Sequence, residues 1–556
     1  MDIVDAECYR YRRFKTGEED IRLLEIEDAH SHCDETVVAR LRHCKVDQLD
    51  DVYIRGARKK AYEALSYSWG PTSADGSHLS DIIFCDGQPL KVTATLNQCL
   101  KRYRATRHGR RACKLLWVDA ICINQNNMSE KNAHVQGMDR TYHNARTTVI
   151  WLGELTAADS KATMQNTLCR LLTGAGAPYG EWPVWRDVLD RSWFRRRWVL
   201  QEYALSCDKV FMIGDLMMPA SDFMACIWKV GLRDEYEDLT KVSELPAAGR
   251  VIETPIEAAM EKSLLSRLHQ FSSAENSHPL DCVYALHSIS ADRYEVTVDY
   301  RKSVRELDEE VAALYLSEWT TALPLLVSAL LWSNPAYPSW LPDCERSKTV
   351  MRRGTRRRDD LIPKRAASPP PELTPICKPM RENSYHLQDL LLRYEEVRRD
   401  HPHAEDRDYV YDQKKFFWRA PEIQGDRLSL SAFLYREVTV GRPAHVQPGT
   451  WFEDRYEVVG VEEGHALAGV HIEDWGHCRV ASRVSQSEAL TLGTPLFVRI
   501  LCLFRLSSHA LVLSGPRDGP YGRTYRLIDV VHIPKLRVIW WRNFLRTQNE
   551  ITVLLE

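Results

Sequence analysis

The chain has 556 residues, of which 44% are hydrophobic and 27% are charged. A chain of this length forms about two to four domains, and its hydrophobic content excludes an intrinsically disordered protein. The 74 basic and 77 acidic residues leave a formal net charge of −3. No overall electrostatic field therefore favours binding to nucleic acid or to a membrane surface.

We expect no secretory signal and no membrane span. Its N-terminus has acidic residues where a secretory signal has an apolar core. The longest apolar stretch, residues 322–332, is too short to span a bilayer. The 15 cysteines are odd in number and include no Cys-x-x-Cys pair, which is typical of reduced thiols rather than disulfides or a zinc site. We expect a cytoplasmic protein with no membrane span and no metal.

Two N-terminal segments have the pattern of strands. Residues 20–27 and 36–46 alternate apolar and polar side chains, as half-buried strands do. We interpret residues 1–49 as lead-in strands that cover the next domain.

Residues 50–215 alternate strand-like and helical segments. The expected strands are residues 65–68, 82–85, 115–122, 148–152 and 211–214, and the expected helices are residues 94–103, 129–145 and 157–173. This alternation predicts an α/β domain with an open, mostly parallel sheet. Residues 115–122 are almost continuously apolar, which is typical of a central strand covered on both faces.

The character of the sequence changes again beyond residue 215. Residues 216–345 are expected to be helical. Residues 346–375 contain five arginines between positions 352 and 358 and a run of three prolines, and they predict an exposed linker. Residues 376–556 predict a β-rich α+β domain that begins with a helix at 385–399. Its expected strands are residues 428–434, 456–461, 496–504, 511–514, 525–533, 537–541 and 551–555.

Polar and aromatic residues follow several of the expected strands. In an open parallel sheet, ligands bind beyond the carboxyl ends of the strands. The candidates are Ser66, Ser68, Trp69 and Gly70 after the first strand, Asp119, Asn124 and Gln125 after the middle strand, and Glu154 after Trp151 and Gly153 on the next. Trp69 offers a flat face for stacking a base or ring, and the alternative is a tryptophan in the core.

Glu130 has a structural explanation. Asn127 and Glu130 fit a capping box, in which the two side chains bond to each other's backbone N–H at the start of a helix. The helix expected over residues 129–145 then buries Val135, Met138 and Tyr142 at spacings of three and four. We interpret Glu130 as a cap.

Glu202 has no such explanation. Helical spacing places it on the face shared with Trp198 and Leu205. A carboxylate between these side chains is partly desolvated, which raises its pKa and suits it to acid–base or electrostatic work. The alternative is a salt bridge to one of the arginines at positions 195–197.

Three sequence blocks together resemble the signature blocks of the HET (heterokaryon incompatibility) domain of filamentous fungi. They are residues 62–70 (YEALSYSWG), 116–125 (LWVDAICINQ) and 191–204 (RSWFRRRWVLQEYA), and they occur in the family's order. The resemblance covers roughly residues 20–345 and is thin beyond residue 376. It implies an effector of nonself recognition and programmed cell death that acts with protein partners, with self-association left open.

The HET domain is in turn similar to TIR domains, which share a flavodoxin-like sheet. Enzymatic TIR domains cleave the nicotinamide–ribose bond of NAD⁺ with a helical glutamate a few residues after a tryptophan, and Trp198 and Glu202 match that pattern. The resemblance implies NAD⁺ as a substrate, with no required cofactor. A nearby carboxylate stabilises the oxocarbenium-like state of such a reaction.

The resulting hypothesis assigns roles to the candidate residues. Glu202 and Asp119 would be catalytic, and the ligand-binding residues would be Ser66, Trp69, Gly70, Asn124, Gln125 and Trp198. Glu130, Trp151 and Gly153 would be structural. We expect Trp69, Asp119, Asn124 and Glu202 to converge on one pocket. The alternative hypothesis is a non-catalytic module that triggers cell death by binding partners.

Overall fold

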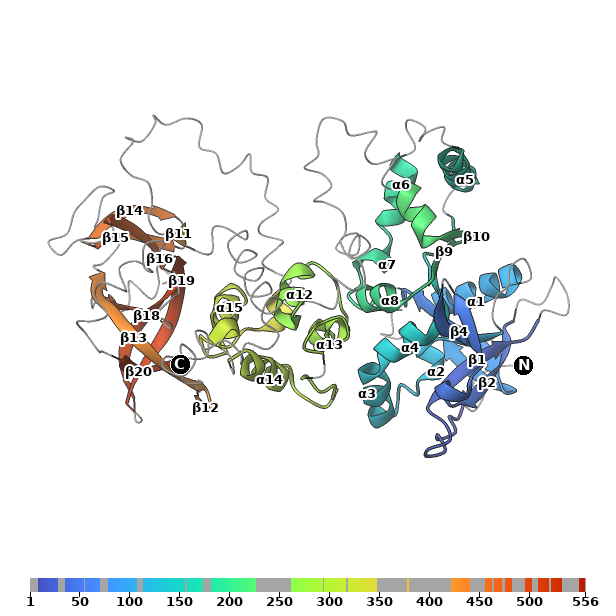
Figure 1. Cartoon of the computed structure of the whole chain (residues 1–556), viewed down its shortest axis with the longest axis horizontal. Helices are drawn as coiled ribbons and strands as arrows, with labels where there is room; N and C mark the ends of the chain where they lie inside the picture. The colour runs from blue at the N-terminus through green and yellow to red at the C-terminus, as the bar shows by residue number, and fades with distance from the viewer. Residues whose placement is uncertain are drawn as a thin grey trace. The chain divides into compact units, whose positions relative to one another are not determined.

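The computed structural model describes residues 9–28, 36–54, 56–70, 79–107, 114–155, 158–173, 182–226, 262–293, 295–316, 319–347, 378–379, 422–440, 456–462, 465–472, 476–482, 496–502, 509–519, 522–532 and 550–555. The chain divides into two compact units, Met1–Arg301 and Lys302–Glu556 (Figure 1). The boundary between them falls inside the region 216–345 that was expected to be helical.

The described part of the first unit is organised around a ten-stranded open sheet with the order β10-β9-β8-β4-β7-β1-β2-β5-β6, to which β3 adds by pairing with β4. The strands are β1 (Ile21–Ile26), β2 (Val38–Cys44), β3 (Asp51–Ile54), β4 (Ala57–Tyr67), β5 (Asp81–Cys85), β6 (Gln88–Val92), β7 (Leu115–Trp117), β8 (Ala145–Trp151), β9 (Lys209–Ile213) and β10 (Leu216–Pro219). Strands and helices alternate along the chain, so the α/β class is confirmed.

The sheet is mixed, so the prediction of a mostly parallel sheet is wrong. Its centre is parallel, because β4 pairs in parallel with β7 and β8, and β8 pairs in parallel with β9. The other neighbours are antiparallel apart from β2 and β5. Strands β5 and β6 are joined by the two-residue turn Asp86-Gly87, in which both residues have positive φ. A turn this short joins only antiparallel strands.

The N-terminal strands belong to this sheet. β1 lies between β7 and β2, and five of its six residues are buried. The predicted lead-in strands therefore extend the sheet instead of covering it. This position also buries the polar side chain of Arg22.

The strand predicted over residues 115–122 has the central position that was expected, but it is much shorter. β7 ends at Trp117, and residues Asp119–Cys122 form the short helix α2. The backbone N–H groups of Ile121 and Cys122 donate to the carbonyl of Val118 at 3.0 and 2.7 Å. An aspartate at the first helical position favours this turn, because it interacts with the N-terminal end of the helix dipole. Apolar content alone does not distinguish a buried strand from a buried helix.

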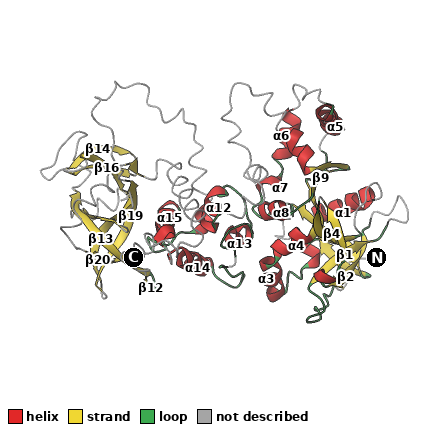
Figure 2. Cartoon of the chain, in the orientation of Figure 1, coloured by secondary structure: helices red, strands yellow, loops and turns green. Residues whose placement is uncertain are grey.

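Helices accompany the strands throughout the first unit (Figure 2). They are α1 (Ala94–Arg107), α3 (Met128–Gln136), α4 (Met138–Asn144), α5 (Ala158–Leu172), α6 (Trp182–Leu189), α7 (Ser192–Arg195), α8 (Val199–Leu205), α12 (Leu264–Gln270) and α13 (Asp281–His287), with a 3₁₀ turn η2 at Val46–Gln48. The single helix predicted over 129–145 is divided at Gly137. Val135, Met138 and Tyr142 are buried as predicted.

The second unit begins with α14 (Val304–Leu316), α15 (Trp319–Leu331) and the 3₁₀ turn η4 (Cys344–Arg346). Its strands are β11 (Lys378–Pro379), β12 (Glu422–Gln424), β13 (Arg427–Val440), β14 (Tyr456–Glu462), β15 (His465–Ile472), β16 (Gly476–Ser482), β17 (Leu496–Cys502), β18 (His509–Gly519), β19 (Gly522–His532) and β20 (Glu550–Leu555). The predicted linker lies almost wholly outside the described residues, as do the helix at 385–399 and the strand at 537–541. In the part of the chain that the structure describes, no helix is both long and apolar enough to cross a membrane.

Candidate functional site

Glu202 lies in the interior of the first unit. It is on α8, whose seven residues are all buried, and only 3% of its surface is exposed. The hydroxyl of Ser66, near the end of β4, donates a short hydrogen bond to Glu202 Oε2. The indole Nε1 of Trp193 donates to Ser66 Oγ at 2.7 Å. Ser66 therefore links the end of a central strand to both α7 and α8.

Burial controls the protonation of Glu202. The pKa of this carboxyl is raised from 4.5 to about 7, chiefly by burial and to a smaller extent by the nearby charge of Asp119. The guanidinium of Arg196 and the hydrogen bond from Ser66 act in the opposite direction. At neutral pH the side chain is thus divided between acid and carboxylate. Among the described residues, no ion pair within 4.0 Å joins Glu202 to an arginine at positions 195–197.

Asp119 is the second acidic group of the site. It is the first residue of α2, directly beyond the end of β7, and is half-buried. Trp69 Nε1 donates to Asp119 Oδ2 at 3.3 Å, and the side chain of Gln125 donates to the Asp119 carbonyl at 3.1 Å. Burial raises the pKa of Asp119, while Arg196 lowers it. The predicted residues at the ends of β4 and β7 therefore do gather in one place.

Gly70 permits the chain to turn away from this group of residues. Its φ is +85°, and a Cβ at this position would lie 2.6 Å from Thr95 Oγ1. Both the backbone conformation and the space exclude an ordinary side chain here.

Arg196 is a site residue whose role was not predicted. Its guanidinium donates a short hydrogen bond to the carbonyl of Tyr67, the last residue of β4. Its charge lowers the pKa of both Glu202 and Asp119, so it lies within electrostatic range of the two carboxyl groups. From the sequence, Arg196 was considered only as one of three arginines that could form a direct ion pair with Glu202.

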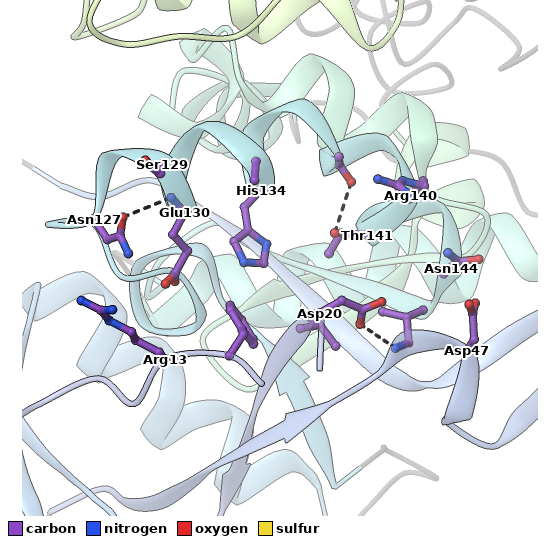
Figure 3. Close-up of a pocket in the computed structure, with 15 residues that line it drawn as sticks. Arg13, Asp20, Asp47, Asn127, Ser129, Glu130, His134, Arg140, Thr141 and Asn144 are labelled. Carbon is purple, nitrogen blue, oxygen red and sulfur yellow. Dashed lines mark hydrogen bonds between the residues drawn. The ribbon is translucent and has the colours of Figure 1, made fainter. Parts of the chain in front are cut away.

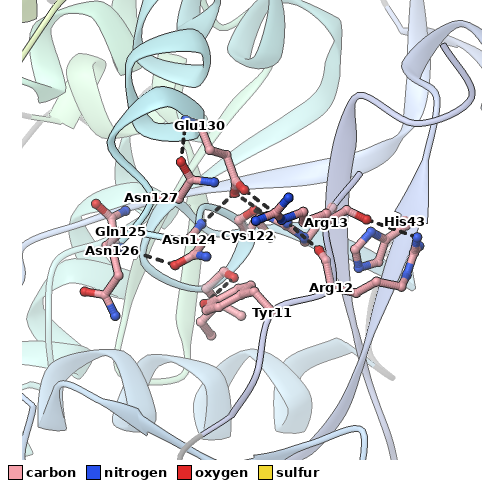
Figure 4. A network of polar contacts seen from close by, with 12 residues as sticks. Tyr11, Arg12, Arg13, His43, Cys122, Asn124, Gln125, Asn126, Asn127 and Glu130 are labelled. Carbon is pink, nitrogen blue, oxygen red and sulfur yellow. Dashed lines mark hydrogen bonds and ion pairs between the residues drawn. The ribbon is translucent and has the colours of Figure 1, made fainter. Parts of the chain in front are cut away.

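Asn124 joins a different network, around Glu130 (Figure 4). Its backbone N–H donates to Glu130 Oε1 at 2.7 Å. Glu130 also forms an ion pair with Arg22, whose side chain is fully buried. Asn127 is the N-cap of α3 and accepts from the Glu130 N–H at 3.3 Å, as predicted. The reciprocal half of the capping box is wrong, because the Glu130 carboxylate bonds to Asn124 and Arg22 instead.

Within the described residues, the candidates at the end of β8 and just beyond it form no hydrogen bond or ion pair with Glu202. Trp151 is the last residue of β8 and is buried. Gly153 has a φ of +99°, which supports its structural assignment to a turn. Glu154 forms an ion pair with Arg102 at 2.7 Å.

Residues 271–282 hold the start of α8 in place through hydrogen bonds with Arg197 and Trp198. Arg197 is fully buried, and its guanidinium donates to the carbonyls of Phe271, Ala274 and Cys282 at 2.9 to 3.3 Å. Trp198 Nε1 donates to Asp281 Oδ2 at 2.8 Å, so this indole is directed to the same segment. Sequence analysis missed these partners because backbone carbonyls leave no signal in a sequence.

The site therefore combines two carboxyl groups with raised pKa values, one arginine and a half-buried indole. Such a set can transfer a proton near neutral pH or stabilise a developing positive charge. Among the described residues, no group of three or more His, Cys, Asp or Glu side chains is placed to hold a metal ion.

The first unit is a mixed α/β domain with Asp119 directly beyond the end of β7 and Glu202 on α8, hydrogen-bonded to Ser66 near the end of β4. Residues 62–202 match the family described as "Heterokaryon incompatibility protein (HET)". This match begins at the first sequence block and ends at Glu202. Residues 62–202 are therefore a HET domain similar to that of heterokaryon incompatibility proteins of filamentous fungi, and the rest of the chain lies outside this match.

Two curated relatives support this assignment. "Heterokaryon incompatibility protein 6, OR allele" of Neurospora crassa is 28% identical over 30% of this chain and 32% of its own length. "Vegetative incompatibility protein HET-E-1" of Podospora anserina is 25% identical over 25% of this chain and 9% of its own length. The chain thus spans about a third of the first relative and about a tenth of the second. No solved structure matches.

Proposed function

We propose that this chain acts in heterokaryon incompatibility, as an effector of fungal nonself recognition that leads to programmed cell death in the cytoplasm. The match of residues 62–202 to the HET family supports this role, as do the incompatibility functions named for both relatives. Protein partners, including a second copy of the chain, would supply the trigger.

The reaction that we propose for the HET domain is TIR-like hydrolysis of NAD⁺. Water adds to the anomeric carbon of the nicotinamide ribose, the bond to nicotinamide breaks, and the products are nicotinamide, ADP-ribose and a proton. The observation that carries this proposal is the buried carboxyl of Glu202, whose pKa is about 7. A carboxylate in a low-dielectric site stabilises an oxocarbenium-like state far better than one in water.

The neighbouring residues have complementary roles in this proposal. Ser66 orients the Glu202 carboxyl through its hydrogen bond. Arg196 limits the rise in the pKa of Glu202, so that a useful fraction is ionised at neutral pH. Trp69 is half-buried and held by Asp119, and it would stack on a planar ring of the substrate.

The test is nicotinamide release from NAD⁺ by the purified full chain. Glu202→Gln keeps the volume of the side chain and removes its charge, so it should abolish release. Glu25→Gln is the matched control, because Glu25 on β1 forms an ion pair with Arg42 on β2 and lies outside the site. Release by the Glu202→Gln variant at the wild-type rate would refute the catalytic assignment.

The second candidate function is a non-catalytic assembly module. The observation that favours it is burial, because Ser66 and Glu202 are only 1% and 3% exposed. In that case the pair is a core hydrogen bond, and cell death follows from binding alone. Expression of the chain in yeast separates the two functions: death with an unchanged NAD⁺ level supports the module, whereas a fall in NAD⁺ that Glu202→Gln prevents supports the enzyme.

A further inference from the structure

Helix α3 has two separate sets of contacts. Glu130 and His134 line a groove between α3 and the N-terminal segment (Figure 3). Lys131 and Asn132 do not line this groove. They contact the end of the first unit instead, at residues 298–300. The reaction proposed above makes no use of this second set of contacts.

Several interactions fix residues 298–300 on α3. Asn132 Nδ2 donates to Asp299 Oδ1 at 2.8 Å, and the Tyr300 N–H donates to Asn132 Oδ1 at 3.2 Å. The ammonium group of Lys131 lies 4.2 Å from the centre of the Tyr300 ring. This distance is favourable for a cation–π contact. Both the backbone and the ring of Tyr300 are therefore held in place just before the chain enters the second unit.

Asp281, the first residue of α13, joins Tyr300 to the start of α8. It is 8% exposed, and each of its carboxylate oxygens accepts a hydrogen bond. Oδ1 accepts from the Tyr300 hydroxyl at 2.7 Å, and Oδ2 accepts from Trp198 Nε1 at 2.8 Å. Within the described residues, no backbone N–H of α13 donates to this carboxylate. The side chain therefore does not cap its own helix.

Trp198 continues this connection to Glu202. Its carbonyl accepts from the Glu202 N–H at 3.3 Å in the first turn of α8. A series of three hydrogen bonds thus links Tyr300 to Glu202 through Asp281 and Trp198. A displacement of Tyr300 therefore shifts the start of the helix that carries Glu202.

The backbone at Arg196 is held by the same part of the chain. The Glu275 N–H donates to the Arg195 carbonyl, and the Arg197 N–H donates to the Glu275 carbonyl, both at 2.7 Å. These two bonds form a parallel bridge between Arg196 and Glu275. Residues beyond the HET match at 62–202 therefore hold both Arg196 and Glu202.

The bonds to Asp281 are of the strong kind. Hydrogen bonds to an ionised carboxylate are roughly twice as strong as those between neutral groups. Removing one donor leaves a buried carboxylate oxygen without its partner, which is costly. Catalysis is also sensitive to small movements, because displacing a catalytic group by about 1 Å can cost about 100-fold in rate. A loss at Tyr300 should therefore be felt at Glu202.

We propose that Asp281 and Tyr300 are positioning residues of the active site, which hold α8 so that Glu202 and Arg196 are correctly placed for the reaction. The active site then depends on the end of the first unit, up to the residue before the boundary at Arg301. The catalytic consequence rests on the proposed hydrolysis of NAD⁺. The hold on α8 does not, and it is measured without NAD⁺.

Hydrogen–deuterium exchange of the full chain measures the hold on α8. Tyr300→Phe removes only the hydroxyl and keeps the ring. It should speed exchange of the α8 amides by about tenfold and leave α1 unchanged, because one hydrogen bond to a charged group is lost. Tyr9→Phe is the matched control, since Tyr9 is also half-buried and donates to a carboxylate, Asp86, at 3.0 Å. Unchanged exchange of α8 in Tyr300→Phe, or equal acceleration in α1, would overturn the proposal.

A double-mutant cycle tests the route through Asp281. Trp198→Phe removes the indole donor and with it the link from Asp281 to α8. In that background Tyr300→Phe should change the exchange of α8 by less than about twofold. Acceleration by about tenfold in both backgrounds would show that Tyr300 acts by another route and would overturn the proposal. Should Trp198→Phe fail to fold, Asp281→Asn replaces it in the cycle, because its amide can accept from only one of the two donors.

Steady-state kinetics of nicotinamide release tests the catalytic consequence. Tyr300→Phe should lower kcat by about tenfold or more and leave KM for NAD⁺ nearly unchanged, because Glu202 acts on the transition state. Tyr9→Phe should retain both wild-type values. A wild-type kcat in Tyr300→Phe would overturn the positioning role. Absence of release by the wild-type chain would refute NAD⁺ hydrolysis instead, and the exchange of α8 then decides whether Tyr300 holds this helix.

Discussion

Replacing Glu202 by glutamine should stabilise the protein, and by an amount that depends on pH. The amide keeps the volume of the carboxyl and can still accept the hydrogen bond from Ser66. What it removes is the cost of holding a negative charge in the interior. A residue retained for catalysis at the expense of stability should show this behaviour.

The magnitude follows from the pKa of Glu202. Folding raises it from 4.5 to about 7, so the folded state binds the proton more tightly than the unfolded state does. The stability linked to the protonated group is complete below pH 4.5 and is lost as the pH rises through about 7. Between fully protonated and fully ionised Glu202, the free energy of unfolding differs by about 3 kcal/mol. From pH 5 to pH 8, the free energy of unfolding of wild type should therefore fall by roughly 2 to 3 kcal/mol relative to that of Glu202→Gln.

Urea unfolding of wild type and variant at pH 5 and pH 8 gives the free energy of unfolding of each protein at each pH. Comparing the two proteins isolates Glu202, because groups that titrate elsewhere in the chain contribute equally to both. Tryptophan fluorescence follows unfolding, and Trp193, which donates to Ser66 beside Glu202, is one of its reporters in the first unit. Glu25→Gln, at a surface ion pair, should change stability by less than about 0.5 kcal/mol at both pH values. An effect of Glu202→Gln that is destabilising and equal at pH 5 and pH 8 would refute the buried, proton-binding carboxyl.

Three further substitutions test the supporting structure by urea unfolding. Arg197→Met leaves three backbone carbonyls without their donor and should cost about 3 kcal/mol, whereas a loss below 1 kcal/mol would show that solvent satisfies them. Arg22→Met leaves the Glu130 carboxylate without its ionic partner and should cost about 3 to 5 kcal/mol, and adding Glu130→Gln should restore part of this. Gly70→Ala should cost about 2 kcal/mol or more, from the positive φ and the contact with Thr95; full rescue by Thr95→Ala would contradict the contribution of the backbone.

The sequence predicted those parts of the fold that depend on local patterns. The alternation of apolar segments predicted β4, β8 and β9, and they form the parallel centre of the sheet. It did not predict the direction of the flanking strands, which short turns such as Asp86-Gly87 determine. It also could not place the end of β7, because the run of apolar residues continues from the strand into α2.

The same limit applies to the candidate site. Strand ends indicated Ser66, Trp69 and Asp119 correctly as neighbours, because parallel strands bring their carboxyl ends together. Asn124 was grouped with them by its position in the sequence, yet its backbone bonds to Glu130. The contact of Ser66 with Glu202 joins residues 136 positions apart, and only the packing of α8 against β4 creates it.

The central claim, that Glu202 is a catalytic carboxylate, is tested most directly by the pH dependence of nicotinamide release from NAD⁺ by the full chain. Because the ionised form stabilises the oxocarbenium-like state, the rate should rise with pH through a single ionisation near 7 and then level off. Glu202→Gln should show no release at any pH. Absence of release by wild type between pH 5 and pH 9, or the same profile in the Glu202→Gln variant, would contradict the claim.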